Sequence, residues 1–95
     1  MALVTAGPGL TNIITAMAGA YLESRELLVI GGQVKTADLA RGKLRQRGIQ
    51  EIDGVSIARP VSKVSELIDA PISKSAFTAL VKESAKPRKG PVFLE

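Results

Sequence analysis

The chain contains no cysteine, no histidine and no tryptophan, and aromatic residues make up only 3% of its 95 residues. The lack of cysteine excludes a disulfide framework within the chain. Without cysteine and histidine, these residues alone cannot form a Cys/His zinc site or a histidine-based catalytic triad. The scarcity of aromatic side chains also argues against a platform that stacks the bases of a single-stranded nucleic acid.

Charge is absent from the first 22 residues, Met1–Leu22. A signal peptide would begin with basic residues, and a membrane span would need an unbroken apolar run. Neither is present, because Gly7-Pro8-Gly9 interrupts the apolar stretch. We therefore expect no membrane association and a cytoplasmic protein.

The apolar content is high for so short a chain, at 45% hydrophobic residues with a mean hydropathy of +0.18. Most of it is Ile, Val, Leu and Ala, which suits parallel strands buried on both faces by helices. A chain of 95 residues supports one core. It begins within an apolar run and stops just after another, so we expect a piece of a larger domain.

The net charge of +4 is concentrated in two basic segments, Lys35–Arg47 and Lys82–Lys89. Such segments can bind phosphate groups or nucleic acid. For Lys82–Lys89 we favour a solvated helix end, where cations suit the helix dipole. For Lys35–Arg47, we leave open whether the segment binds anions or is a solvated loop. No aromatic residues interleave with either segment, so we do not expect nucleic acid as a partner.

Short apolar runs alternate with helical patterns in the order that an α/β fold requires. The helix around 11–24 is apolar on nearly all sides and should be covered from both. The loop 35–48 should hold a helical turn near 37–40. We expect strands at 2–6, 27–30, 61–64 (at a sheet edge) and 92–94, and helices at 11–24, at 51–58 ending before Pro60, and from Pro71 to about Lys86–Pro87.

The segment Thr5–Asn12 is the most informative stretch, because a strand there leads through glycines into a helix. Gly7 and Gly9 let the backbone turn sharply and let another molecule approach closely. Thr11 or Asn12 is expected to cap the helix. Ligands of α/β proteins usually sit where a strand ends and a helix begins. On its own, this turn favours a plain strand-to-helix connector, because short glycine patterns match by chance.

Considered together, several segments resemble one family, the pyrimidine-binding (PYR) domain of thiamine-diphosphate enzymes of the acetolactate synthase and pyruvate oxidase group. The resemblance is collinear over essentially the whole chain. Its segments are Thr5–Asn12, Tyr21–Ser24, Leu27–Val34, Gln50–Asp53, Arg59–Val61 and Gly90–Leu94.

This resemblance implies a parallel β-sheet flanked by helices, of which residues 1–95 would form the C-terminal part. It also implies that thiamine diphosphate lies between this domain and the diphosphate-binding domain of another subunit. Thr5, Pro8, Asn12 and Gln50 would contact the cofactor. Ile49 and Gln50 would line the substrate pocket.

The family's catalytic glutamate would lie upstream of residue 1, so the resemblance implies no catalytic residue in this chain and no activity from it alone. Magnesium would bind on another domain, FAD is a further possible cofactor, and the enzyme would be a homo-oligomer. The substrate class would be a 2-oxo acid such as pyruvate, which is decarboxylated before its acyl carbanion is transferred to an acceptor.

Two departures from the family pattern border the substrate pocket. Arg41–Gly48 is several residues longer than in typical acetolactate synthases, and Ile49 stands where an aromatic residue is usual. The basic loop suggests an acceptor that is phosphorylated or nucleotide-linked. The alternative to an enzyme is a non-catalytic binding or oligomerisation module that retains the fold.

The remaining polar candidates have simple structural explanations. Gln33 is expected to cap a backbone group or face an interface rather than to catalyse. Glu51 and Asp53 could be paired carboxylates for acid–base work, but we favour the exposed first turn of a short helix. Arg59 could form a salt bridge or meet a ligand.

Overall fold

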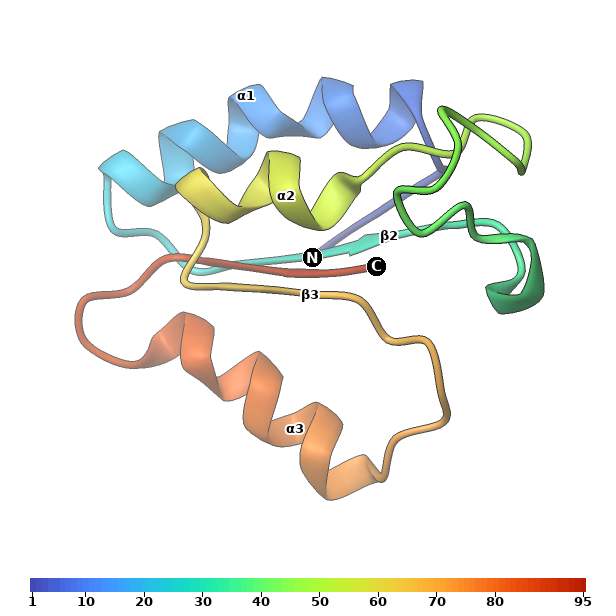
Figure 1. The fold of residues 1–95 in the computed structure, drawn as a ribbon. Helices are drawn as coiled ribbons and strands as arrows, with labels where there is room; N and C mark the ends of the chain where they lie inside the picture. The colour runs from blue at the N-terminus through green and yellow to red at the C-terminus, as the bar shows by residue number, and fades with distance from the viewer.

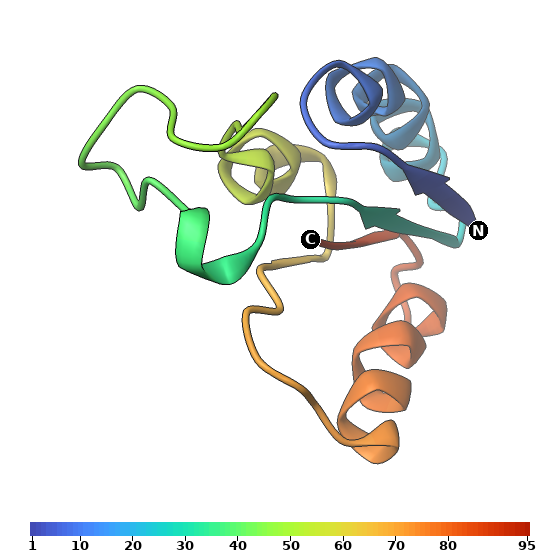
Figure 2. The same ribbon diagram turned by 90° about the vertical axis from the view of Figure 1, so that its right-hand side faces the viewer.

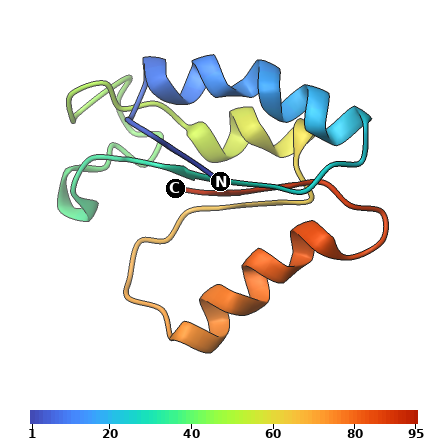
Figure 3. The same cartoon turned by 180° about the vertical axis from the view of Figure 1, so that it is seen from behind.

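The computed structural model describes all 95 residues as a parallel sheet with helices on both faces (Figure 1). Helices α1 and α2 cover one face, and α3 lies on the other (Figure 3). The strands are β1 (Ala2–Val4), β2 (Leu27–Gly31), β3 (Val64–Glu66) and β4 (Pro91–Leu94), in the order β1-β2-β4-β3. The helices are α1 (Pro8–Leu22), α2 (Gly54–Ala58) and α3 (Lys74–Lys82). The predicted α/β class is confirmed.

The core lies between the sheet and the α1/α2 layer. Leu10 and Met17 of α1, Val29 of β2 and Phe93 of β4 are fully buried there, together with Ala58 of α2. All four residues of β4 are buried, because this strand is central and pairs with β2 and β3. An apolar run without alternation is what a strand covered on both faces requires.

Three helices begin elsewhere than their sequence patterns predict. Helix α1 begins at Pro8 rather than Thr11, because Pro8 suits the first helical position and Gly7 makes the turn before it. Helix α2 begins at Gly54 rather than Glu51, and α3 at Lys74 rather than Pro71. Asp53 and Ser73 cap these two helices by accepting backbone N–H groups, and capping residues set where a helix starts.

Other boundaries also shift. The first strand ends at Val4 rather than Ala6, and the expected strand 61–64 lies at Val64–Glu66, though at a sheet edge as predicted. Helix α2 does end at Ala58, before Pro60 as predicted, and a 3₁₀ turn, η2 (Arg59–Val61), follows it. Similar turns occupy η1 (Thr36–Asp38), near the expected 37–40, and η3 (Glu83–Ala85) after α3.

Helix α1 is covered on one side only within this chain. Leu10 and Met17 face the core, whereas Leu22 is 74% exposed at the far end of the helix. On the neighbouring sheet edge, Leu3 of β1 is 75% exposed. The cover that the sequence pattern predicts for the other side of α1 is therefore not supplied by residues 1–95. No helix in the structure has the length and apolar character needed to cross a membrane.

Candidate functional site

The carboxyl ends of all four strands meet at one edge of the sheet, because every pair is parallel. Figure 2 views the molecule from this edge. Thr5 follows β1, Gly32 and Gln33 follow β2, and Glu95 follows β4. The long loop between β2 and α2 also begins and ends here. This edge is where ligands bind in open α/β sheets.

The turn after β1 is packed directly against Gln50. Gly7 has a φ of +61°, and a Cβ atom built on it would lie 2.7 Å from the Gln50 carbonyl oxygen. Only glycine fits a backbone that is both left-handed and this close to another chain segment. The structure thus brings together Thr5–Asn12 and Gln50, which the sequence separates by about 40 positions. Gln50 itself has a φ of +58°.

The other predicted site residues lie open to solvent around this contact. Thr5 and Pro8 are exposed on the turn, and Asn12 is exposed about one helical turn further along α1. Ile49 is 85% exposed next to Gln50. Within Gly7-Pro8-Gly9, Pro8 is the exposed residue, whereas Gly7 is buried against Gln50 and the Thr5 methyl lies beside Gly9.

The expected capping by Thr11 or Asn12 is wrong. Gly7 occupies the N-cap position, no side chain caps α1, and the Thr11 hydroxyl donates instead to the Pro8 carbonyl oxygen at 3.1 Å. Gly9 also differs from expectation, since it lies within the first turn of α1 rather than in the preceding bend. Pro8, the first residue of α1, has no backbone N–H, and the Thr11 N–H already donates to the Gly7 carbonyl oxygen at 3.0 Å.

Glu51 organises the loop that precedes Gln50, a role that the sequence pattern did not reveal. Its carboxylate accepts the backbone N–H groups of Ala40 at 2.6 Å and of Arg47 and Gly48 at 2.9 Å each. These three hydrogen bonds lower the pKa of Glu51, and the one from Gly48 contributes most. The expected place in the first turn of a helix is wrong for Glu51, whereas Asp53 is the α2 N-cap.

Gln33 and Glu95 form a second polar group at the same edge. The Gln33 amide nitrogen donates to the Ile52 carbonyl oxygen at 2.8 Å and to the Glu95 carboxylate at 3.2 Å. This confirms that Gln33 caps a backbone group. Burial, with a smaller contribution from the charge of Asp53, raises the pKa of Glu95 to about 7. The contact spans 62 positions of sequence, so no local signal pointed to it.

Two hollows border the basic loop rather than the glycine turn. The larger, of 430 Å³, is lined by Gln33, Glu95 and Asp53 and by part of the loop, including Arg41 and Arg45. The smaller, of 360 Å³, lies against Arg41, Lys43 and Arg47. None of Thr5, Pro8, Asn12, Ile49 and Gln50 lines either hollow. The predicted cofactor contacts thus form an open surface beside these hollows.

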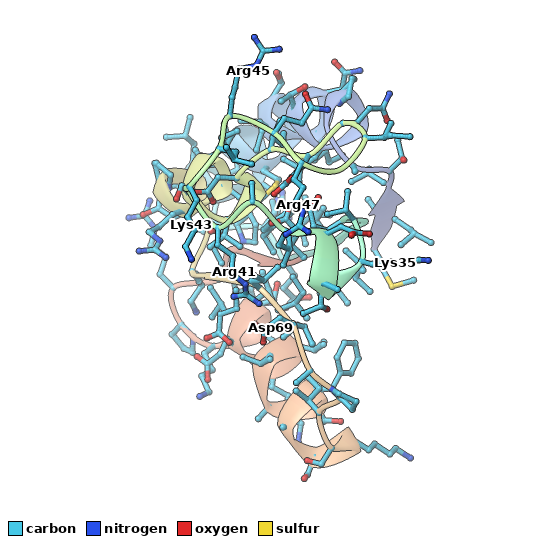
Figure 4. All side chains as sticks on the ribbon, turned by 45° about the vertical axis from the view of Figure 1, so that its right-hand side comes forward. Lys35, Arg41, Lys43, Arg45, Arg47 and Asp69 are labelled. Atoms are coloured by element: carbon cyan, nitrogen blue, oxygen red, sulfur yellow. The ribbon has the colours of Figure 1, made fainter.

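The cations of the basic loop do not converge on one point (Figure 4). Arg45 extends away from the body of the molecule, and Lys35 points to another side. Arg41 forms a salt bridge with Asp69 at 3.2 Å. The group that the structure does bring together is Arg41, Lys43 and Arg47, around the smaller hollow.

The remaining charged candidates form surface ion pairs or have no direct ionic partner. In the second basic segment, Lys86 pairs with Glu83, and Lys89 pairs with Glu26 at 2.7 Å. This agrees with a solvated, ion-paired surface. Arg59 forms no salt bridge; its charge only helps to lower the pKa of Asp53, which is set mainly by the hydrogen bonds from Ser56.

A parallel sheet with a glycine turn at its carboxyl edge is typical of α/β ligand-binding domains. Comparison with known proteins makes this specific. Residues 1–57 match the family described as "Thiamine pyrophosphate enzyme, N-terminal TPP binding domain". The chain belongs to this family, and the predicted PYR-domain resemblance is confirmed. Thiamine diphosphate, another name for thiamine pyrophosphate, is the family's cofactor.

Individual relatives cover the whole chain. It is 42% identical to the acetolactate synthase isozyme 3 large subunit of Escherichia coli K12, over 98% of this chain and 16% of that protein. It is 38% identical to 2-hydroxyacyl-CoA lyase 2 of Danio rerio over 100% of this chain and 15% of the relative, and 38% to that of Homo sapiens over 100% and 14%. The chain therefore spans about one sixth of the length of the curated relatives it matches.

The structure is compatible with the cofactor's aminopyrimidine ring. A flat ring needs an exposed apolar surface, and the exposed Pro8 ring provides one, while Gly7 and Gly9 let Gln50 and Thr5 pack closely beside it. Thr5 and Asn12 offer polar groups beside it. The charged diphosphate has no such counterpart at the turn, where residues 1–22 carry no cation.

Proposed function

We propose that residues 1–95 hold the pyrimidine half of thiamine diphosphate in an acetolactate-synthase-like enzyme that acts on a 2-oxo acid. The packing of Gly7 against Gln50 carries this proposal, because it joins the family's cofactor turn to the residue expected to face the substrate. When bound, the cofactor supplies the electron sink needed to cleave the bond beside a 2-oxo group. The protein's own residues bind and orient.

Each site residue has a distinct task in this proposal. Pro8 and the flanking glycines support one face of the pyrimidine, and Thr5 and Asn12 contact its edge. The Gln50 amide donates a hydrogen bond toward the substrate carbonyl. Ile49 shapes the apolar side of the substrate pocket. Neither Thr5, Asn12 nor Gln50 titrates near neutral pH, so these residues position groups and do not transfer protons.

The rest of the enzyme is also part of the proposal. Residues 1–95 would be one part of a PYR domain, with preceding βα units and further domains in the full-length protein. The catalytic glutamate would lie upstream, and magnesium and the diphosphate would bind on a domain of another subunit. We further propose a cytoplasmic homo-oligomer, an acyl-transferring activity, and FAD as a second cofactor.

Two relatives' names suggest different reactions, acetolactate synthesis and cleavage of a 2-hydroxyacyl-CoA. Gln50 would face the carbonyl group in both. Ile49 is smaller than an aromatic residue and leaves more room beside it, which favours an acceptor larger than pyruvate.

The test is steady-state kinetics of the full-length protein with pyruvate, thiamine diphosphate and Mg²⁺. Gln50→Ala should lower kcat/KM for pyruvate by about 10–100-fold, because it removes one hydrogen bond to a developing charge. Gln46→Ala, in the same loop, should leave kcat/KM within about two-fold, since surface changes are usually small. Equal losses in the two variants would show that Gln50 has no specific role.

A further inference from the structure

The smaller hollow beside the basic loop differs in charge from the rest of the carboxyl edge. Its polar lining consists of Thr36, Arg41, Lys43 and Arg47, and the other lining residues are Ala and Leu. No carboxylate lines it. The larger hollow next to it combines Arg41 and Arg45 with the carboxylates of Glu51, Asp53 and Glu95. A cationic hollow of this composition favours an anionic ligand.

Hydrogen bonds hold the backbone of the loop that carries these cations. Glu51 accepts the backbone N–H of Arg47, and the Lys43 N–H donates to the Ala40 carbonyl at 3.0 Å. Arg41 is fixed by its 3.2 Å salt bridge to Asp69, whose carbonyl also accepts the Thr36 hydroxyl at 3.4 Å. Lys43 and Arg47 form no salt bridge. Lys43 and Arg47 therefore line one hollow without a salt-bridge partner, and the charge of Arg47 also helps to lower the pKa of Glu51 (Figure 4).

The loop that lines the hollow is followed directly in the sequence by the residues of the proposed substrate site. Arg47 precedes Ile49 and Gln50 by only a few residues, and Gln50 contacts the Gly7 turn. The loop that carries these cations therefore leads directly into the residues of the proposed substrate site. At 360 Å³, the hollow lies at the lower end of the usual range for small-molecule sites, which suits a headgroup rather than a whole substrate.

We propose that Arg41, Lys43 and Arg47 form a subsite for the phosphate-ester group of the acceptor substrate. Guanidinium and ammonium groups bind phosphate through short, charge-assisted hydrogen bonds. The Thr36 hydroxyl adds a neutral donor. This inference rests on the proposed function for the identity of the ligand as an acceptor, but the anion site itself is defined by the loop.

The test is calorimetric titration of the full-length protein, saturated beforehand with thiamine diphosphate and Mg²⁺ so that the cofactor's own diphosphate site is filled. Inorganic pyrophosphate probes the shared chemistry. Uridine diphosphate and coenzyme A probe the two sources of such a group. Wild type should bind pyrophosphate saturably, and a Lys43→Gln/Arg47→Gln variant should bind it at least about 10-fold more weakly.

The matched control is Lys74→Gln/Lys82→Gln, which removes two exposed cations on α3 and leaves the loop unchanged. Affinity for pyrophosphate should stay within about two-fold of wild type in this control. Tighter binding of uridine diphosphate or of coenzyme A than of pyrophosphate would identify the source of the ligand. Undetectable binding by wild type, or equal weakening in both double variants, would overturn the subsite.

Failure of the subsite can be told apart from failure of the proposed function. Thiamine diphosphate affinity, measured separately in the same wild-type protein, tests the cofactor role without reference to the loop. A protein that binds the cofactor but not pyrophosphate would lack the subsite only. Amide hydrogen exchange at Ala40 and Gly48 would verify that Lys43→Gln/Arg47→Gln leaves the loop folded, since its backbone contacts to Glu51 are retained.

Discussion

At the scale of single residues, Gly7 and Gly19 differ in whether the structure has room for a larger side chain. Gly7, with a φ of +61°, has no room for a Cβ atom because Gln50 lies against it. Gly19 lies within α1, and a Cβ atom there would meet nothing within 4 Å. The first glycine is required by the site, whereas the second only weakens the helix.

Gly7→Ala should therefore lower the free energy of unfolding by about 1–3 kcal/mol, through backbone strain and the clash with Gln50. Gly19→Ala should raise it by about 0.5–1 kcal/mol, as alanine favours helix. Urea denaturation of the chain followed by circular dichroism measures both. Similar effects of the two substitutions would show that Gly7 is not constrained.

Glu95 links stability to pH. Its folded pKa of about 7 lies above the ordinary value of 4.5, so the folded state favours the protonated carboxyl. The contribution of Glu95 to stability is fully present below about pH 4.5 and is lost as pH rises through about 7. Glu95 is only half-buried, so we expect an effect of about 1 kcal/mol after solvent screening.

Glu95→Gln should flatten the dependence of unfolding free energy on pH between about 5 and 8. Asp53→Asn should lower the pKa of Glu95, because it removes the neighbouring negative charge. Urea denaturation at several pH values measures the dependence, and Glu66→Gln, at an exposed position, is the matched control. A Glu95→Gln profile as steep as that of wild type would contradict this assignment.

At the scale of elements, the loop between β2 and α2 is ordered by one side chain. The Glu51 carboxylate accepts hydrogen bonds from three backbone N–H groups, which in a helix or sheet would donate to backbone carbonyl groups. Glu51→Gln should speed amide hydrogen exchange at Ala40, Arg47 and Gly48, while amides of β4 stay protected. Mass spectrometry of exchanged peptides can resolve the two regions. Unchanged exchange in the loop would mean that Glu51 does not hold it.

The elements also show what a sequence can predict. Alternation of apolar runs and helical patterns correctly predicts the order of strands and helices, since burial sets that alternation. The exact starts of α2 and α3 are set by the capping residues Asp53 and Ser73, whereas hydrophobic spacing places both starts about three residues too early.

The site was predictable only in part. The glycine turn and the resemblance to a family predict Thr5, Pro8, Asn12 and Gln50 as cofactor contacts, and in the structure the turn packs against Gln50. The contacts of Glu51 and the Gln33–Glu95 pair could not be predicted, because they depend on loop geometry and on strands that meet only after folding. The sequence of α1 predicts that its second side is apolar, but it does not identify the molecule that covers this side.

At the scale of the whole molecule, several large apolar side chains are exposed. Met1 and Leu3 at the β1 edge and Leu22 at the end of α1 are 86%, 75% and 74% exposed. Exposed apolar side chains at a sheet edge favour association. Residues 1–95, studied alone, should therefore sediment as oligomers.

Leu3→Lys should shift this material toward monomer, because a charge at an edge strand opposes pairing. Leu44→Lys, at a loop position that is 62% exposed, should leave the sedimentation profile unchanged. Sedimentation velocity at several concentrations distinguishes the two. A wild-type chain that is monomeric throughout would contradict the expectation.

The most direct test of the cofactor site is a crystal structure of the full-length protein with thiamine diphosphate and Mg²⁺ bound. We predict that the aminopyrimidine ring lies in van der Waals contact with Gly7-Pro8-Gly9, beside Thr5 and Gln50, and opposite a second subunit. A structure in which the ring binds elsewhere, with the turn buried beneath other protein side chains, would contradict the assignment.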